Sequence, residues 1–111
     1  MRATRTTAVL GILLASLVTA APAAEAVTTK TVAMTSSNTF FPKTVTVTRG
    51  TIVKWTNKSF FSTHTSTSNT GLWNSGRVAP GASYSRTFKR SGTYRYHCSF
   101  HSGMTGKVVV S

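Results

Sequence analysis

The chain has 111 residues, enough for one domain, and it is strongly basic, with 13 Lys and Arg side chains against one acidic residue. The acidic residue is Glu25, so the chain beyond it offers no side-chain carboxylate. This excludes general acid-base catalysis by Asp or Glu and any Ca²⁺ or Mg²⁺ site built from carboxylate side chains.

The first 26 residues have the pattern of a secretory signal peptide. Two arginines precede a mostly apolar run over residues 8–18, which is too short to span a bilayer, and a stretch of small residues follows. Cleavage frames end at Ala23 and at Ala26, and we favour the second. We therefore expect residues 1–26 to be removed on export to the periplasm or the cell exterior. No cysteine near this segment offers a lipid anchor.

The predicted mature domain, residues 27–111, keeps 11 of the 13 basic residues and no acidic one, a formal net charge of +11. It contains one cysteine, Cys98, which has no partner for an internal disulfide. Because a lone thiol tends to be oxidised in an oxidising compartment, an exported Cys98 is expected to be occupied, and a metal ion would occupy it.

Residues 27–111 favour strands, because Val, Thr and aromatic residues dominate and turn signals recur at short intervals. The pattern predicts an all-β antiparallel sandwich or small barrel, with a loop or weak strand over residues 62–69. The predicted strands cover residues 30–34, 44–49, 51–57, 83–88, 92–98 and 106–110.

Side-chain alternation in the strand over residues 92–98 separates two neighbouring candidate ligands. Tyr94, Tyr96 and Cys98 share one face, and the two tyrosines are typical of a core. Cys98 is therefore expected to point inward at the strand's end. His97 falls on the opposite face with Arg95, which excludes it from a site built around the thiol.

The turn after this strand carries Cys98, His101 and Met104 in a Cys-x2-His-x2-Met motif. A soft thiolate, an imidazole and a thioether suit a copper ion that alternates between Cu(I) and Cu(II). Gly103 gives the turn the flexibility of a tight loop. A His₂Cys set needs one more nitrogen, and His64 is the histidine that remains.

The sequence around the motif resembles the cupredoxins, especially the short-loop amicyanin and plastocyanin-like members. The similar segments are Phe41-Pro42-Lys43, residues 50–57, Pro80-Gly81 and Gly92-Thr93-Tyr94. The resemblance implies a Greek-key β-sandwich of about seven to eight short strands that binds one type I copper ion. It also implies equatorial ligation by His64, Cys98 and His101, a long axial bond from Met104, and electron exit at the solvent-facing edge of His101.

Thr65, Ser99 and Phe100 are expected to surround the ligands. Thr65 stands where asparagine is common in the family, and its hydroxyl is expected to tie the two ligand loops together. Phe100 stands where many relatives have proline, and so restores a backbone N–H near the thiolate. If that N–H reaches the sulfur, it favours Cu(I) and raises the potential.

These features favour a single-electron carrier and not an enzyme, because four protein ligands leave the copper no obvious open position. Phe60, Phe61 and Phe100 are candidates for an apolar docking patch, although Phe60 and Phe61 equally suit a core. The net charge predicts a monomer that docks electrostatically with an acidic redox protein.

Other functions remain open on the sequence. A copper carrier or scavenger would use the same ligands. A binder of anionic polymers would explain the charge, but the basic residues are spread along the chain and form no nucleic-acid motif. Zinc is disfavoured because a thioether is a poor fourth ligand for it, and a cysteine protease is disfavoured because an inward thiol suits one badly.

Overall fold

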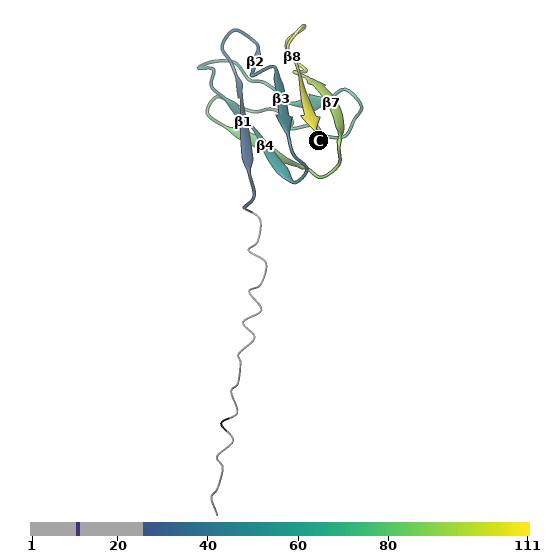
Figure 1. Cartoon of the computed structure of the whole chain (residues 1–111). Helices are drawn as coiled ribbons and strands as arrows, with labels where there is room; N and C mark the ends of the chain where they lie inside the picture. Colours follow the sequence, from purple (N-terminus) through teal and green to yellow (C-terminus); the bar gives the residue numbers. More distant parts are fainter. Residues whose placement is uncertain (1–10, 12–25) are drawn as a thin grey trace, which may run out of the picture.

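The structure, a computed structural model, describes Gly11 and residues 26–111. All regular structure in this part is β-strand, and eight strands form two four-stranded sheets (Figure 1). Apart from Gly11 and Ala26, the predicted signal peptide lies outside the described residues. Among the described residues, no helix is long and apolar enough to cross a membrane.

The two sheets each combine strands from distant parts of the chain. The first sheet has the order β2-β1-β4-β6, in which the strands are β2 (Phe40–Phe41), β1 (Thr29–Met34), β4 (Thr51–Asn57) and β6 (Ser83–Phe88). The second has the order β3-β8-β7-β5, in which the strands are β3 (Thr44–Val47), β8 (Thr105–Val110), β7 (Gly92–His97) and β5 (Thr67–Ser68).

The predicted strands are all present, and the β-sandwich of about eight strands is confirmed. The prediction that the sandwich is antiparallel is only partly correct: β1 pairs with β4 and β3 pairs with β8 in parallel, and the other four pairings of the described strands are antiparallel. Alternation within one strand reports which face is buried but not which strand lies alongside. The two-residue strand β2 was not predicted, since so short a segment carries no period.

Large aromatic side chains fill the space between the sheets. Trp55 of β4 and Tyr96 of β7 are fully buried, and their rings meet edge to face with centroids 5.3 Å apart. Trp73, from the loop before β6, is also buried and donates its indole N–H to Ser66 Oγ at 3.0 Å. The core thus combines Trp55 and Tyr96, one from each sheet, with the loop residue Trp73. The alternation of side chains in the sequence did not predict that Trp73 is part of the core.

One end of the sandwich gathers the loops that carry the candidate ligands. Met34 and Asn57, the last residues of β1 and β4, are register partners at this end. The Lys58 N–H beyond them donates to the Met34 carbonyl at 2.9 Å. His97 ends β7 in the other sheet, and Cys98 follows it directly. The loops that follow β1 and β4 in one sheet and β7 in the other therefore lie at the same end of the sandwich.

Candidate metal centre

His64 is held on a short bridge between two loops. Its backbone pairs with Val78, with N–H to carbonyl distances of 3.2 and 2.8 Å in the two directions. Asn57 supports both sides of this bridge, because its amide donates to the Ser62 carbonyl at 2.7 Å and to the Val78 carbonyl at 2.9 Å. Asn57 is buried, and its role was not foreseen from the sequence. The sequence signal that could have revealed this role is a polar residue at the end of a buried strand face, because a buried amide needs hydrogen-bond partners.

The imidazole of His64 is fully buried, and its orientation is set by a backbone carbonyl. Nε2 lies 3.1 Å from the Thr35 carbonyl oxygen, which only accepts, so Nε2 carries the hydrogen and Nδ1 keeps its lone pair. Burial lowers the pKa of His64 below its usual value, and nearby His101 lowers it further, while the Thr35 carbonyl opposes the change. The neutral form favoured in this way is the one that binds a metal ion.

A compact turn places the other candidate ligands. The Cys98 N–H donates to the Met104 carbonyl at 3.0 Å, and the Met104 N–H donates to the His101 carbonyl at 3.2 Å. Gly103 sits in this turn at φ +80°, a conformation that side chains rarely adopt. Cys98 and Met104 are buried and His101 is half-buried, so among the three candidate ligands in this turn His101 lies nearest solvent.

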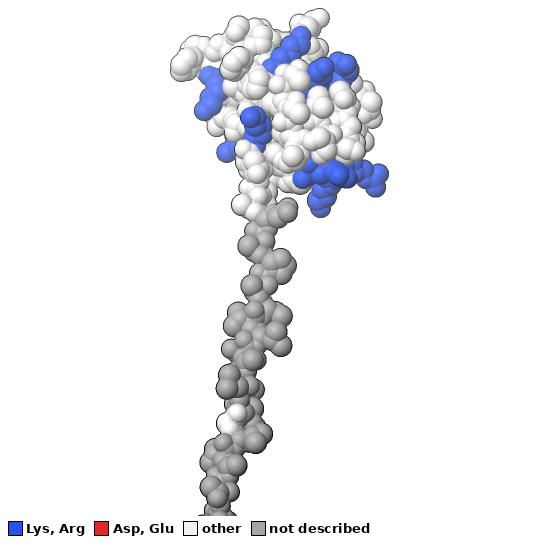
Figure 2. All heavy atoms as spheres, viewed as in Figure 1, with Lys and Arg blue, Asp and Glu red and all other residues white. Residues whose placement is uncertain are grey.

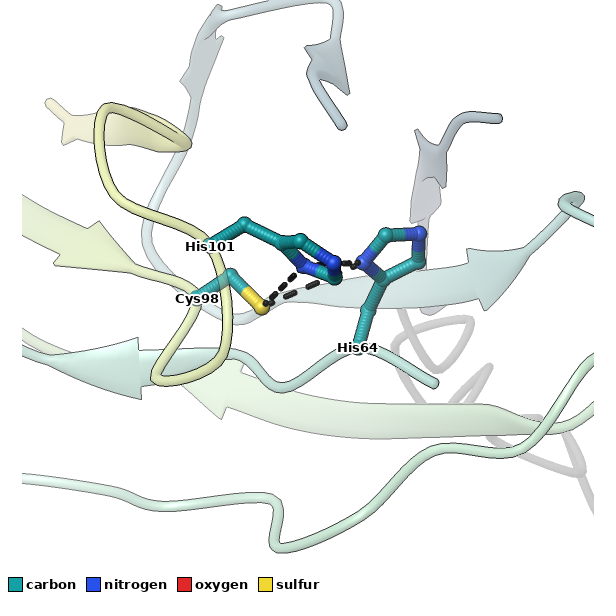
Figure 3. Close-up of side chains that lie close together, drawn as sticks. All are labelled: His64, Cys98 and His101. Carbon is teal, nitrogen blue, oxygen red and sulfur yellow. Dashed lines mark hydrogen bonds between the residues drawn. The ribbon is translucent and has the colours of Figure 1, made fainter. Parts of the chain in front are cut away.

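The donor atoms of His64, Cys98 and His101 converge on one point from two chain segments (Figure 3). The two Nδ1 atoms are 3.3 Å apart. Cys98 Sγ lies 3.5 Å from Nδ1 of His101 and 3.9 Å from Nδ1 of His64. Ligand atoms placed trigonally at about 2.0–2.3 Å from a shared ion would be roughly 3.5–3.7 Å apart. The donor set and its spacing therefore fit one copper ion.

The outward histidine is separate from this cluster. His97 is half-buried on the other face of β7 and donates from Nδ1 to the Asn69 side-chain oxygen at 2.6 Å. Its imidazole is thus engaged away from Cys98. The structure brings together His64, Cys98 and His101, the three residues that the family resemblance implies as ligands, and it leaves His97 outside the cluster.

Thr65 links the two ligand-bearing segments. Its hydroxyl oxygen accepts a hydrogen bond from the Ser99 N–H at 2.8 Å. Its backbone N–H donates to Cys98 Sγ at 3.4 Å. Among the described residues no hydrogen bond joins the Phe100 N–H to this sulfur, so the expectation that Phe100 supplies the donor is not met. Thr65 supplies it, because the segment after His64 runs alongside the thiolate.

The aromatic residues proposed for docking are exposed. Phe60 and Phe61 are 82% and 97% exposed, so neither belongs to the core. Phe100 is partly exposed, and the Arg77 guanidinium lies 5.1 Å from its ring centroid. The loop that carries Phe60 and Phe61 is anchored through Asn57, whose amide bonds Val78, the neighbour of Arg77. Phe60 and Phe61 thus lie in the loop before His64, and Phe100 lies in the turn before His101.

Comparison with known proteins supports the same family throughout the domain. The sequence model of the Cupredoxin-like domain matches residues 8–110. A curated relative, plastocyanin of Sambucus nigra, is 54% identical over 35 residues, which cover 30% of this chain and 35% of that protein. The alignment thus spans about a third of the plastocyanin.

Several solved structures have the same fold as this chain. A novel purple cupredoxin from Nitrosopumilus maritimus is 29% identical with a TM-score of 0.67, over 73% of this chain and 98% of that one. A Cu(I) form of an amicyanin variant is 28% identical with a TM-score of 0.70, over 78% and 85%. A Cu-containing nitrite reductase from Thermus scotoductus is 28% identical with a TM-score of 0.68, over 73% of this chain but 22% of that one.

Proposed function

The chain belongs to the cupredoxin-like domain family, and from that premise we propose that it is an exported copper protein that carries single electrons. The observation that carries the proposal is the convergence of His64, Cys98 and His101 within a largely buried site. When bound there, copper supplies a one-electron couple between Cu(I) and Cu(II). Met104, which is buried and accepts the Cys98 N–H at its backbone carbonyl, is the fourth residue that would hold the ion.

The protein's part is to keep the donors in one arrangement for both oxidation states. Thr35 fixes the ring of His64, and Thr65 fixes the sulfur of Cys98. The Asn57 bonds hold the loop before His64 in place. Because these contacts come from protein groups and not from solvent, little reorganisation is needed when the charge at the site changes. This favours electron transfer over catalysis on a bound substrate.

The same geometry suggests where electrons leave. His101 is the partly exposed donor, and exposed aromatic side chains of Phe60, Phe61 and Phe100 belong to the loops at the same end. We propose that these residues form the docking patch. The basic side chains are spread over the visible surface, and none of the described residues is acidic (Figure 2). An acidic partner would therefore be attracted over long range, and added salt would weaken the attraction.

The test is to add Cu(II) to the purified protein and to record the visible spectrum. We expect an intense thiolate-to-copper band that is absent in Cys98→Ser. The matched control His97→Gln removes a neighbouring imidazole outside the cluster and should keep the band. A colourless wild-type protein, or full colour in Cys98→Ser, would refute copper ligation by this cluster.

A second measurement distinguishes an electron carrier from a copper carrier, which would use the same ligands. Reversible voltammetry together with slow loss of copper to a chelator in both oxidation states supports electron transfer. Rapid loss in either state supports metal delivery instead. Export is tested by measuring the mass of the protein recovered outside the cytoplasm. We expect the mass of a chain that begins at Val27.

A further inference from the structure

A cavity of about 360 Å³ lies on the second sheet, and it is lined mainly by cations and neutral hydrogen-bonding groups. Three of its residues are basic, namely Lys43, Arg95 and Lys107, and Thr44, Thr105 and Asn69 add hydroxyl and amide groups. None of these residues is a candidate copper ligand or belongs to the proposed docking patch. The cavity therefore calls for a separate explanation.

The strand register places the basic residues side by side. Lys107 of β8 is the Cα partner of Arg95 on one side and of Thr44 on the other. Lys43 is adjacent, because its carbonyl accepts the Lys107 N–H at 2.9 Å. Directly opposed residues project from the same face with Cβ atoms about 4.5–5.5 Å apart, and like charges in such pairs are destabilising.

No acidic side chain in the described part of the chain neutralises these charges, because residues 26–111 include no Asp or Glu. The unfavourable pairing of Arg95 with Lys107 is therefore maintained without a counter-ion from the protein. An anion bound between the two side chains would turn this repulsion into charge-assisted hydrogen bonding.

The neutral groups around the cavity are also suited to an anion. Asn69 is fixed by its backbone N–H, which donates to the Arg95 carbonyl at 3.0 Å. The side-chain oxygen of Asn69 is engaged by His97, so its NH₂ group is the part left to donate elsewhere. Together with the hydroxyls of Thr44 and Thr105, this gives donors from several directions, as a tetrahedral oxyanion requires.

We propose that this cavity binds a doubly charged oxyanion of the phosphate class. A second cavity, of about 350 Å³, also has three basic residues, but it is less suitable. Its Arg86 stacks on the rings of Trp73 and Phe88 at 4.8 and 5.0 Å, and Leu72 supplies an apolar wall. The first cavity combines opposed cations with hydroxyl and amide donors, so the proposal rests on it.

Inorganic phosphate is the probe for the test, titrated into the copper-loaded protein at pH 8 and constant ionic strength set by chloride. Amide NMR shifts are expected to saturate and to concentrate on the residues that line the cavity. The variant Arg95→Gln/Lys107→Gln should bind phosphate at least about tenfold more weakly, since it removes two of the three charges.

The matched control is Arg49→Gln/Lys54→Gln, which removes one Arg and one Lys from exposed positions outside this cavity. It should bind phosphate as the wild type does. Shifts that rise linearly without saturation, that spread over both sheets, or that weaken equally in the control would overturn the proposal, because they indicate screening of the overall charge.

Stability gives an independent readout. Without phosphate, Arg95→Gln/Lys107→Gln should unfold at a temperature no lower than the wild type, since it relieves a like-charge pair. With saturating phosphate, the wild type should gain more thermal stability than this variant. A lower unfolding temperature for the variant would contradict the repulsion between Arg95 and Lys107. Lys43→Gln is a second variant of the same site, and equal stabilisation of it and of the wild type by phosphate would also count against the proposal.

Discussion

The Thr65 hydroxyl accepts a hydrogen bond from the Ser99 N–H at 2.8 Å, and this contact joins the segment that carries His64 to the turn that begins at Cys98. The two residues are 34 positions apart in the chain. Because Thr65 also donates its own N–H to Cys98 Sγ, a single residue holds both the ligand turn and the thiolate.

Thr65→Val should therefore lower the stability of the ligand site, because it removes the hydroxyl while keeping the side-chain volume nearly unchanged. The variant leaves the Ser99 N–H without its acceptor, at a cost of about 1–2 kcal/mol in the free energy of unfolding. Chemical denaturation of the copper-free protein measures this. Thr67→Val is the control: the Thr67 hydroxyl bonds the hydroxyls of Thr65 at 2.9 Å and of Ser99 at 3.1 Å, but its loss leaves the Ser99 N–H with its acceptor. An equal loss in both variants would contradict a special role for Thr65.

Asn57→Ala should be more damaging than loss of an exposed amide. It deprives the carbonyls of Ser62 and Val78 of a buried donor, and Ser59 of an acceptor, so we expect a loss of about 2–4 kcal/mol. The copper affinity should fall as well, since the bridge to His64 loosens. Asn69→Ala, at an exposed position, should cost less than about 1 kcal/mol by the same denaturation assay. Similar losses of stability in Asn57→Ala and Asn69→Ala would refute the role of Asn57 in supporting the bridge to His64.

The hydroxyl of Tyr96 should make stability depend on alkaline pH. Burial raises the pKa of Tyr96 to about 12, while the indole of Trp55 opposes the shift. The folded pKa is above the value of about 10 for an unfolded chain, so the neutral phenol's contribution is complete below pH 10. It is lost as the pH rises from about 10 to 12, by roughly 2–3 kcal/mol at about 1.4 kcal/mol per unit.

Tyr96→Phe isolates this effect from other groups that titrate at high pH. The Tyr96 hydroxyl has no hydrogen-bond partner among the described residues, so its removal should cost little at pH 7. The free energy of unfolding of the wild type should fall relative to the variant between pH 10 and 12. Parallel curves for the two proteins would contradict the prediction.

The double variant Phe60→Ser/Phe61→Ser tests the proposed docking patch without a known partner. The rate of electron self-exchange, measured by NMR line broadening, should fall several-fold if two molecules meet at the proposed patch. Stability should hardly change, since both side chains are exposed. Leu72→Ser, at an exposed apolar position in another loop, is the control. Equal rates in wild type and double variant would exclude the patch from electron exchange.

Salt offers a further check on the same rate. Two strongly cationic molecules repel each other, so self-exchange of the wild type should become faster as the ionic strength rises. Transfer to an acidic protein should become slower under the same conditions. A rate of self-exchange that is independent of salt would show that the overall charge does not govern the encounter.

Local patterns were sufficient to predict most of the fold. The strands at Thr51–Asn57 and Ser83–Phe88 were predicted to the residue, because alternation and flanking turn residues agree there. Strand pairing was not predictable. The parallel partners β1 and β4 are separated in the chain by β2, which lies on the far side of β1, and by β3, which belongs to the other sheet. Trp73 and Asn57 were missed as organising residues because their roles depend on loops that meet only in the fold.

The primary structure defines the chemistry of this protein: a carboxylate-free domain with one thiol, a Cys-x2-His-x2-Met turn, and His64 as the histidine left to complete a copper donor set once strand phase excludes His97. That much is local, since residue type and strand phase are written into neighbouring positions. The tertiary structure decided that Thr65, not Phe100, donates to the thiolate, that Phe60 and Phe61 face solvent, and that Arg95 lies opposite Lys107. These relations join distant segments, and packing alone determines which groups come within reach.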